Sequence, residues 1–425
     1  MKIIYPPDQS SESIHRIVAE AKGDVVFVGD PRTPVEPGSR MFERMAQVVT
    51  ESGAGWVYSD SLNHPRIDYQ LGSIRDGFDF GPVVAVSTAA AREAGTHNGH
   101  RFGGLYDLRL RISEKRPIVR VPETLYRDRA ATELDHDARF AYVDPQNRDY
   151  QIEMEAIATD HLKRIGAFLE PKFRPFEPAK NRAGFPVEAS VVIPVRNRER
   201  TIEDAVRSAL SQETDFPFNV IVVENHSTDQ TGQILRRLAD SRLVVHVPAR
   251  PDLGIGGCWN EAIFHERCGR YVAQLDSDDL YSSPGTLQQI VDALRAGPYA
   301  LVVGAYTLVN FQLQEIPPGL IDHREWTRDN GRNNALRVNG FGAPRAYATS
   351  VVRAIGFPNV SYGEDYAMAL RVSREYDVGR IYDSIYVCRR WDGNSDSSLP
   401  LETANRHDLY KDWVRTNEIR ARQQR

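Results

Sequence analysis

The sequence predicts an α/β protein whose core is a mixed, mainly parallel sheet flanked by helices. Short apolar runs rich in valine and isoleucine alternate with amphipathic segments of helical period between residues 189 and 294. Polar loops follow several of the strand-like runs, and a shorter series of similar segments precedes them. Such alternation is typical of strands that pair in parallel and are covered by helices.

Length and charge exclude several other classes of protein. A chain of 425 residues is too long for one core, so two or three globular units are expected. The net charge of −5 gives no general attraction to nucleic acid, and no nucleic-acid partner is expected. No apolar run approaches the roughly 20 residues of a membrane span. The three cysteines lack metal-ligand spacing. We therefore expect a soluble, cytoplasmic protein.

A proline-rich stretch at residues 169–178 divides the sequence. Its prolines remove backbone donors and restrict the residues before them, which excludes a continuous helix or a central strand. We place a linker at 166–188, between an N-terminal domain at 1–165 and a catalytic domain at 189–396. A helical tail at 397–425 completes the predicted organisation.

The elements beyond the linker follow one another in a regular order. The first predicted helix places Ile202, Val206 and Ala209 on one face, which is the pattern of a helix packed on a sheet. The predicted strands span residues 189–195, 218–223, 243–247 and 271–275. The predicted helices span residues 201–211, 231–238, 256–266 and 285–294.

Polar residues of several chemical types follow three of these strands. The segments are Val191–Asn197, Glu224–Asp229 and Leu275–Asp279. Ligands of such sheets bind at the carboxyl ends of the strands, so the three segments are expected to form one site. The last segment contains an Asp-Ser-Asp-Asp run. Mutual repulsion among its carboxylates favours a bound divalent cation or another positive group.

Two parts of the sequence resemble each other. Residues 103–113 superimpose without gaps on residues 363–373, and residues 23–32 resemble residues 269–278. We interpret the earlier part as a shortened, degenerate and non-catalytic copy of the later one; chance similarity of two α/β segments is the alternative. The copy lacks the acidic residues, because Arg32 replaces Asp278, Gly104 replaces Glu364 and Leu105 replaces Asp365.

Taken together, the motifs after residue 189 resemble those of family 2 glycosyltransferases, which have the GT-A fold. That family carries a strand with Pro-x-x-Asn, an acidic-Ser-Thr-Asp turn, a Gly-rich helix start, an Asp-x-Asp and a later Glu-Asp. Similar motifs occur here in that order within residues 189–396. The resemblance implies an inverting enzyme that uses a nucleotide sugar.

A metal site is implied at the Asp-x-Asp. Asp276 and Asp278 would hold Mn²⁺ or Mg²⁺, with Asp278 as the more direct ligand, and the cation would bridge oxygens of the donor diphosphate. For Asp279 the alternative is a structural role as N-cap of the following helix.

Donor contacts are implied at the first two strand ends. Pro194, Arg196 and Asn197 would shape the wall around the nucleobase. Asn225 stands where the family usually has an aspartate that accepts the uracil imide proton, and Glu224 would orient Asn225 or assist at the ribose. UDP is the preferred nucleotide. An amide is compatible with other base edges, so guanosine and thymidine stay open.

Further donor contacts are implied later in the chain. Gly254, Gly257 and Asn260 belong to the Gly-rich helix start, whose backbone amides would face donor oxygens. The sequence departs from the family at Trp259, which replaces an arginine and fits either a sugar-stacking or a core position. Arg390, in an Arg-Arg-Trp segment, is expected near the diphosphate.

The acceptor side is implied by the Glu-Asp pair. Asp365 is the candidate base that removes the acceptor hydroxyl proton. Glu364 would hold the acceptor or the base in position, and a helix cap is its alternative role. Trp326 and Trp391 are expected acceptor contacts, and Trp391 also stands where many relatives have a metal-binding histidine.

The predicted function is metal-dependent transfer of a sugar to a hydroxyl acceptor, such as a glycan or glycoconjugate precursor. Expected partners are the nucleotide sugar and the acceptor, whereas self-association and a peripheral membrane contact stay open. A non-catalytic nucleotide-sugar-binding scaffold and a sugar nucleotidyltransferase are the alternatives. The nucleotidyltransferase lacks support, because no Gly-rich, Lys-containing phosphate loop follows the first strand.

Overall fold

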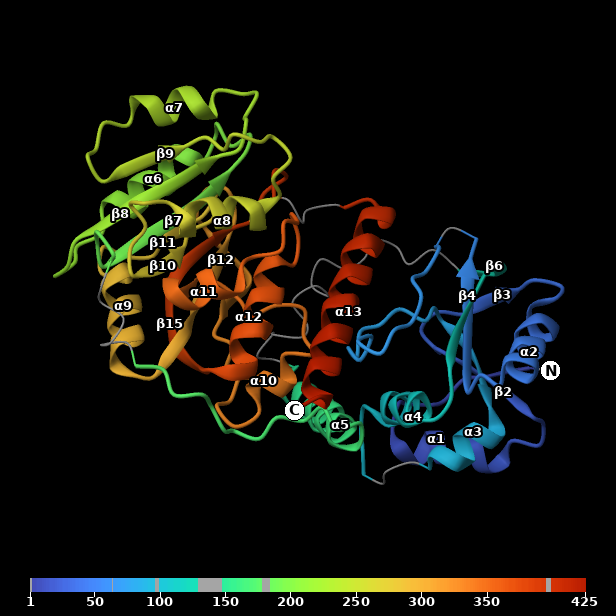
Figure 1. The fold of residues 1–425 in the computed structure, drawn as a ribbon. Helices are drawn as coiled ribbons and strands as arrows, with labels where there is room; N and C mark the ends of the chain where they lie inside the picture. The colour runs from blue at the N-terminus through green and yellow to red at the C-terminus, as the bar shows by residue number, and fades with distance from the viewer. Residues whose placement is uncertain (1, 63, 96–98, 129–146, 178–183, 395–398) are drawn as a thin grey trace. The chain divides into compact units, whose positions relative to one another are not determined.

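The computed structural model forms two compact units (Figure 1). The first comprises Met1–Phe168, Leu336–Val338 and Pro400–Arg425, and the second comprises Leu169–Ala335 and Asn339–Leu399. The structure describes residues 2–62, 64–95, 99–128, 147–177, 184–394 and 399–425. Part of the expected linker, residues 178–183, and the expected boundary at 396/397 lie outside the described residues.

The second unit is built on a mixed sheet, as the sequence predicts. Its strands follow the order β11-β15-β12-β14-β10-β7-β8-β9, and β13 pairs with β12. The four strands β10, β7, β8 and β9 pair in parallel, whereas β14 is antiparallel to both of its neighbours. The strands are β7 (Ala189–Val195), β8 (Phe218–Glu224), β9 (Leu243–His246), β10 (Tyr271–Gln274), β11 (Leu280–Tyr281), β12 (Tyr299–Val309), β13 (Glu315–Ile321), β14 (Arg345–Ala348) and β15 (Asp377–Arg389).

Helices cover this sheet, with α6 and α8 on β7 and β8, and α9 and α12 on β12 (Figure 1). On α6, Ile202, Val206 and Ala209 are fully buried, which matches the predicted apolar face. Each element predicted between residues 189 and 294 is present, with ends that differ by at most two residues. The helices are α6 (Ile202–Leu210), α7 (Thr231–Arg237), α8 (Ile255–Phe264), α9 (Thr286–Ala296), α10 (Gly331–Asn334), α11 (Thr349–Ile355) and α12 (Glu364–Glu375).

The first unit contains a six-stranded sheet in the order β1-β2-β5-β4-β6-β3. Its strands are β1 (Ile3–Ile4), β2 (Val25–Gly29), β3 (Val35–Pro37), β4 (Trp56–Ser61), β5 (Val83–Ser87) and β6 (Ile118–Asp128). Its helices are α1 (Ser11–Glu20), α2 (Met41–Ser52), α3 (Thr88–Ala94), α4 (Gly104–Ser113), α5 (Arg148–Arg164) and α13 (Leu401–Gln423). Separate apolar clusters form the core on its two faces, one around Trp56 and Tyr58 and the other around Met41 and Met45.

The two sheets share strand order and strand direction. Read as β3-β6-β4-β5-β2-β1, the first sheet matches β11-β15-β12-β14-β10-β7 of the second, with each pair parallel or antiparallel in both. The register of the strands agrees as well. Asp60 pairs with Thr124 in the first sheet and Ala305 pairs with Ser384 in the second, and each pair lies between two irregularities in the strand register. Thr124 and Ser384 differ by the same 260 positions that relate the sequence repeat.

Helix α13 is fixed to the first unit by buried polar contacts. Arg415 Nη1 donates to Asp412 Oδ1 at 2.7 Å, and both side chains are fully buried. The same carboxylate accepts from Arg75 Nε at 3.2 Å, and Gly72 N donates to Thr416 Oγ1 at 2.8 Å. The C-terminal helix therefore completes the core of the N-terminal unit.

The described part of the expected linker, residues 169–177, forms no helix or strand. Leu169 exchanges two hydrogen bonds with the amide of Asn333, at 3.0 and 2.9 Å, and Arg174 N donates to Glu375 O at 2.7 Å. This segment therefore lies against the second unit.

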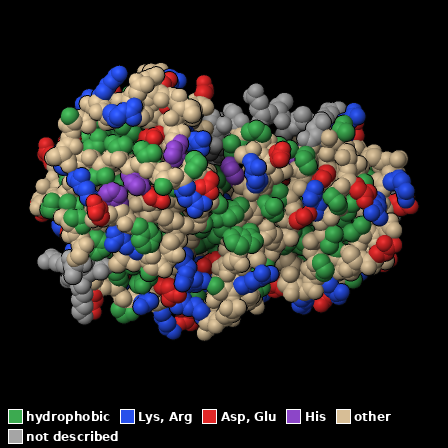
Figure 2. All heavy atoms as spheres, turned by 45° about the horizontal axis from the view of Figure 1, so that its top comes forward, with side chains coloured by type: hydrophobic (Ala, Val, Ile, Leu, Met, Phe, Trp, Pro, Cys, Tyr) green, Lys and Arg blue, Asp and Glu red, His purple; other side chains and the backbone are tan. Residues whose placement is uncertain are grey.

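None of the described helices is long and apolar enough to cross a membrane. Figure 2 shows acidic and basic side chains interspersed over the visible face, which fits the small net charge.

Candidate active site

The three motif segments follow adjacent strands of the second sheet. Strand β7 pairs in parallel with β8 on one side and with β10 on the other. Parallel neighbours end at the same edge of a sheet, so the segments after these strands emerge together. The topology therefore brings the three motif segments to the same edge of the sheet.

Asn197 joins the first two motif segments. Its backbone is left-handed, with φ +54°, and its N–H donates to Ser227 Oγ at 3.0 Å. Its Oδ1 accepts from Thr228 N at 2.8 Å. Pro194 lies inside β7 opposite Val223, and Arg196 is exposed. The asparagine therefore stabilises the wall of the site through contacts within the protein.

Glu224 and Asn225 lie buried at the end of β8. Glu224 Oε1 accepts from Ser227 N at 2.6 Å, which fixes the turn that follows. Asn225 Nδ2 donates to Leu253 O at 2.8 Å, so the orientation of the amide is set by the protein. Its Oδ1 is buried and finds no donor among the described residues. An unsatisfied buried acceptor of this kind suits the N–H of a bound base.

The Gly-rich helix start does not have the expected role. Gly254 N donates to Asn359 Oδ1 at 2.8 Å and Gly256 N to Val360 O at 3.0 Å, so these amides are engaged within the protein. A Cβ at Gly256 would collide with the carbonyl oxygen of Pro358. The glycines therefore permit the close approach of the segment from Pro358 to Ser361.

Three further residues of α8 pack against Phe357 and Asn359. A Cβ at Gly257 would collide with the side chain of Asn359. Asn260 exchanges two hydrogen bonds of 2.9 Å with the backbone of Phe357. Trp259 is buried and stacks on Phe357 with ring centroids 5.1 Å apart. Trp259 is thus a core residue, and the contacts of Gly257 and Asn260 are structural, which does not support the expected donor contacts there.

Asp276 is held at the end of β10. Gln274 Nε2 donates to its Oδ1 at 2.8 Å, and Asp276 N donates to Tyr386 Oη at 3.0 Å. Burial raises the pKa of Asp276, and the neighbouring carboxylates of Asp278 and Asp365 raise it further. Such repulsion is relieved by a cation, so the site favours positive charge.

Asp278 is held by two hydrogen-bond donors and one ion pair on the same oxygen. Its Oδ2 accepts from Trp391 Nε1 and from Asn394 Nδ2, both at 3.1 Å, and Arg198 Nε lies 3.7 Å away. Within the described part of the chain, no hydrogen bond reaches Oδ1. One oxygen is therefore oriented by the protein and the other is available to a ligand.

Asp279 has a structural role, although not the helix cap weighed from the sequence. Its Oδ1 accepts from Arg389 N at 2.7 Å and thereby ties the aspartate run to β15. Helix α9 begins only at Thr286 and has no side-chain cap. Burial raises the pKa of Asp279 well above its usual range, and the charges of Asp278 and Asp276 raise it further.

The carboxylates of Asp276 and Asp278 fit a hard divalent cation. Each carries an oxygen to which none of the described residues donates a hydrogen bond, and Mn²⁺ and Mg²⁺ prefer oxygen ligands. Among the described residues, no three His, Cys, Asp or Glu side chains are arranged to hold a metal on their own. A cation held by these two carboxylates would complete its coordination with other oxygen ligands, such as water or a bound molecule.

The Glu-Asp pair opens α12 directly after Gly363, which has φ +83°. Asp365 Oδ2 forms an ion pair with Arg345 Nη1 at 2.9 Å. Burial raises the pKa of Glu364 to about 8, and the charge of Asp365 adds to this. Glu364 Oε2 is buried and without a donor among the described residues. The pair thus contains an ion-paired aspartate and a glutamate whose pKa is raised by burial.

The remaining expected site residues lie in different environments. Trp391 is half-buried and contacts Arg200, whose guanidinium lies 4.9 Å from its ring. Arg390 N donates to Val309 O at 2.7 Å, which fixes the backbone of the Arg-Arg-Trp segment. Trp326 is buried and packs on Phe341 with centroids 4.8 Å apart. Its burial leaves little surface for the expected acceptor contact.

Three site residues were not predicted from the sequence. Arg345 contacts Asp365, while Arg198 and Asn394 contact Asp278. Arg198 follows the first motif by one position, and Asn394 follows Trp391 by three, so proximity in sequence was a usable signal for these two. Arg345 lies in no motif, and only the antiparallel pairing of β14 with β10 brings it to the aspartates.

Comparison with known proteins finds a family match within the second unit. Residues 190–353 match the sequence profile of glycosyl transferase family 2. Over 125 residues the chain is 35% identical to glycosyltransferase AglD of Haloferax volcanii, covering 28% of this chain and 20% of that protein. Over 101 residues it is 36% identical to UDP-Glc:alpha-D-GlcNAc-diphosphoundecaprenol beta-1,3-glucosyltransferase WfaP of Escherichia coli, covering 24% and 39%. The chain thus spans less than half of the length of these relatives.

Two solved structures are similar at low identity. One is TarS of S. aureus in complex with UDP-GlcNAc, with a TM-score of 0.42 and 22% identity over 55% of this chain and 72% of that chain. The other is glucosyl-3-phosphoglycerate synthase of Mycobacterium tuberculosis, with a TM-score of 0.38 and 18% identity over 58% and 86%.

Proposed function

Because the chain carries a domain of glycosyl transferase family 2 at residues 190–353, we propose that it is an inverting glycosyltransferase with a nucleoside-diphosphate sugar as donor. One observation carries this proposal: Asp276 is within electrostatic reach of both Asp278 and Asp365. Transfer requires that the leaving diphosphate and the base act on one sugar at the same time.

In the proposed reaction, an acceptor hydroxyl attacks the anomeric carbon of the donor sugar. The new C–O bond forms as the bond to the β-phosphate oxygen breaks, and that oxygen leaves with the electron pair. Asp365 takes the hydroxyl proton, which is a general-base role. The ion pair with Arg345 holds this carboxylate in place before the acceptor binds.

Asp276 and Asp278 are proposed to hold Mn²⁺ or Mg²⁺, which supplies positive charge against the departing diphosphate. Trp391 and Asn394 fix Oδ2 of Asp278, so that Oδ1 keeps a defined direction. Oxygens of the diphosphate would supply further ligands to the cation. Cation and donor are therefore expected to bind together.

The donor nucleotide is proposed to be UDP. Asn225 is held by Leu253, and its unsatisfied Oδ1 suits the imide N–H of uracil. One relative, the glucosyltransferase WfaP, has UDP-Glc in its name, which also supports this proposal. The acceptor is proposed to be a hydroxyl of a glycan or glycoconjugate precursor.

The first unit is proposed to be a copy of the second that has lost its chemistry. The shared strand order and register of the two sheets support this proposal, as does the repeat of residues 103–113 at 363–373. Arg32 and Leu105, which stand in for Asp278 and Asp365, hold no metal and remove no proton.

The experiment is a donor screen with the purified protein. With Mn²⁺ and a panel of nucleotide sugars, we expect slow release of nucleoside diphosphate from one donor, and a raised melting temperature with that donor and Mn²⁺. Release of pyrophosphate instead would favour a nucleotidyltransferase. Binding of a donor without any turnover, with or without acceptors, would favour the scaffold.

A further inference from the structure

The first unit contains a pocket of about 660 Å³ that plays no part in the proposed transfer. Its walls come from the ends of β2 and β5, from α4 and α5, and from the segment before α1. This volume lies in the range of about 300–1,000 Å³ that is typical of small-ligand sites.

The pocket occupies the position that corresponds to the proposed transfer site of the second unit. Strands β2 and β5 match β10 and β14 in order and register, since Val26 pairs with Val86 as Val272 pairs with Tyr347. Asp30 and Leu105, both in the pocket wall, fall opposite Asp276 and Asp365 in the sequence repeat. The first unit therefore keeps the cleft of the fold.

The catalytic groups of the cleft have been replaced by protein contacts. Arg32 donates to both oxygens of Asp30, at 3.0 and 2.8 Å, and so supplies the positive charge that a cation would supply. A Cβ at Gly104 would lie 2.6 Å from backbone atoms of Ser10 and Ser11, so a glutamate does not fit there. The pocket is thus retained without metal or base.

Aromatic rings line much of this pocket. Phe80 lies 5.5 Å from Trp56 and 4.5 Å from Phe78, measured between ring centroids. Tyr150 lines another wall and donates to Asp76 Oδ2 at 3.0 Å. Trp56 and Phe78 belong to the core, so the rings with accessible surface are those of Phe80, Phe102 and Tyr150, which are only partly buried. These rings provide flat apolar surface for the C–H faces of a sugar, and the adjacent carboxylates can accept hydrogen bonds from its hydroxyls.

The charged groups of the lining are paired within the protein. Asp30 is paired with Arg32, Asp76 with Arg337 and Asp79 with Arg66, and Asp8 accepts hydrogen bonds from the hydroxyls of Ser10 and Ser13. Arg32 is already paired with Asp30, and Arg109 is buried over the rings of Tyr106 and Phe80, at 4.8 and 5.2 Å. The lining therefore offers no excess of positive charge to hold a nucleotide or a sugar phosphate, whereas a neutral polyol does not need one.

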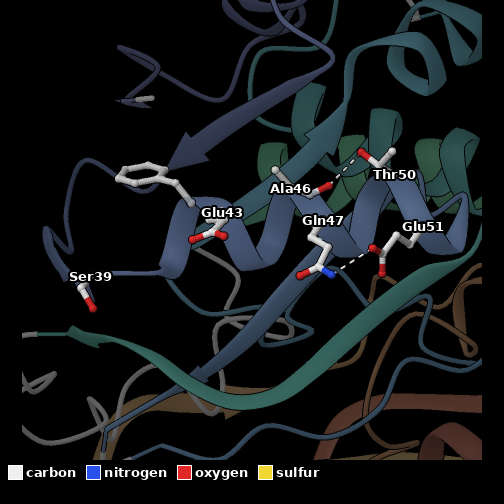
Figure 3. A pocket seen from close by; sticks show the side chains of 7 residues that line it. Ser39, Glu43, Ala46, Gln47, Thr50 and Glu51 are labelled. Atoms are coloured by element: carbon white, nitrogen blue, oxygen red, sulfur yellow. Dashed lines mark hydrogen bonds between the residues drawn. The ribbon is translucent and has the colours of Figure 1, made fainter.

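We propose that this pocket binds a neutral sugar unit of a glycan, as a binding site separate from the transfer chemistry. That the bound glycan is also the acceptor rests on the proposed function, but the binding itself does not. A second cavity of the same unit, of about 530 Å³ on α2, offers a contrast. There Gln47 donates to Glu51 and Thr50 to Ala46, so its polar groups are largely used within the helix (Figure 3).

The test is a titration of the full chain with neutral mono- to tetrasaccharides, without metal or nucleotide, followed by calorimetry and saturation-transfer NMR. We expect one saccharide class to bind with a stoichiometry of one per chain. Leu105→Trp, which fills the pocket, and Tyr150→Phe, which removes one hydroxyl, should weaken binding, the former at least tenfold. Gln47→Ala on α2 is the matched control and should bind like the parent protein.

Two further results decide the proposal. Asp278→Ala should bind the saccharide with unchanged affinity, because the pocket does not use the transfer site; this also separates a failure of the pocket from a failure of the proposed function. Absence of binding to every neutral saccharide, or equal binding by Leu105→Trp, Tyr150→Phe and Gln47→Ala, would overturn the proposal. Competition by UDP for the pocket would also overturn it.

Discussion

The indole Nε1 of Trp391 donates a hydrogen bond of 3.1 Å to Oδ2 of Asp278. The sequence resemblance implies that many relatives have a metal-binding histidine at position 391. Here the tryptophan contacts the carboxylate proposed to hold the cation, and Asn394 contacts the same oxygen. The side chain at position 391 therefore orients the carboxylate that is proposed to hold the cation.

This relationship leads to a spectroscopic prediction. Mn²⁺ is paramagnetic and quenches nearby indole fluorescence, so Mn²⁺ with UDP should lower the emission of the parent protein. Trp391→Phe should lose most of that decrease. Trp413→Phe, which alters an exposed tryptophan of α13, is the control and should retain it. An equal decrease in both variants would place the cation elsewhere.

Glu364 predicts a pH dependence of stability. Its pKa is about 8 in the folded chain, chiefly because of burial, against about 4.5 when unfolded. Unfolding therefore releases a proton between these values, and stability falls as the pH rises from 5 to 8. Glu364→Gln should lose less free energy of unfolding over this range, as measured by urea denaturation. Glu402→Gln, at an exposed position, should follow the parent protein. Parallel curves for Glu364→Gln and the parent would contradict the raised pKa.

Asp365 should affect the chemical step and not donor binding. Asp365→Asn removes the proposed base but keeps the shape of the side chain, so kcat should fall by a factor on the order of 10²–10⁴. The Kd for the donor with Mn²⁺ should change little, as measured by calorimetry. Asp292→Asn makes the same chemical change at an exposed position of α9 and should leave both values unchanged. Full transfer activity in Asp365→Asn would remove Asp365 from the base role.

Asn225 should determine affinity for the base. Asn225→Ala removes the buried Oδ1 acceptor, and UDP should bind about tenfold more weakly, as expected for one lost hydrogen bond. Binding of pyrophosphate with Mn²⁺ should be unaffected, because it has no base. Asn417→Ala on α13 provides the matched control. A parallel loss of both ligands would show that the substitution acts on the diphosphate site or on folding.

The sheet of the second unit was predictable from local patterns, as was the position of the candidate site residues at the ends of its strands. Buried strands such as β7 read as continuous apolar runs, and the order of strands and helices follows from alternation. Asp276 and Asp278 were recognisable because a run of carboxylates after an apolar strand has few structural uses. These predictions depend only on residues close together in sequence.

The contacts that the sequence did not reveal join segments that are distant in the chain. Gly256 is required by Pro358, roughly a hundred positions later, and a glycine does not reveal whether a ligand or the backbone approaches it. Arg345 reaches Asp365 through strand pairing that no local pattern encodes. Trp326 and Trp259 are buried, and an aromatic residue alone does not distinguish a core position from a sugar platform.

The most direct test of the proposed function is release of nucleoside diphosphate from a nucleotide sugar, measured with and without Mn²⁺ in the parent protein and in Asp278→Ala. We expect Mn²⁺-dependent release by the parent and loss of that release in the variant, with an unchanged melting temperature in the absence of ligands. Release by Asp278→Ala at the rate of the parent would contradict the assignment of this carboxylate to the diphosphate site.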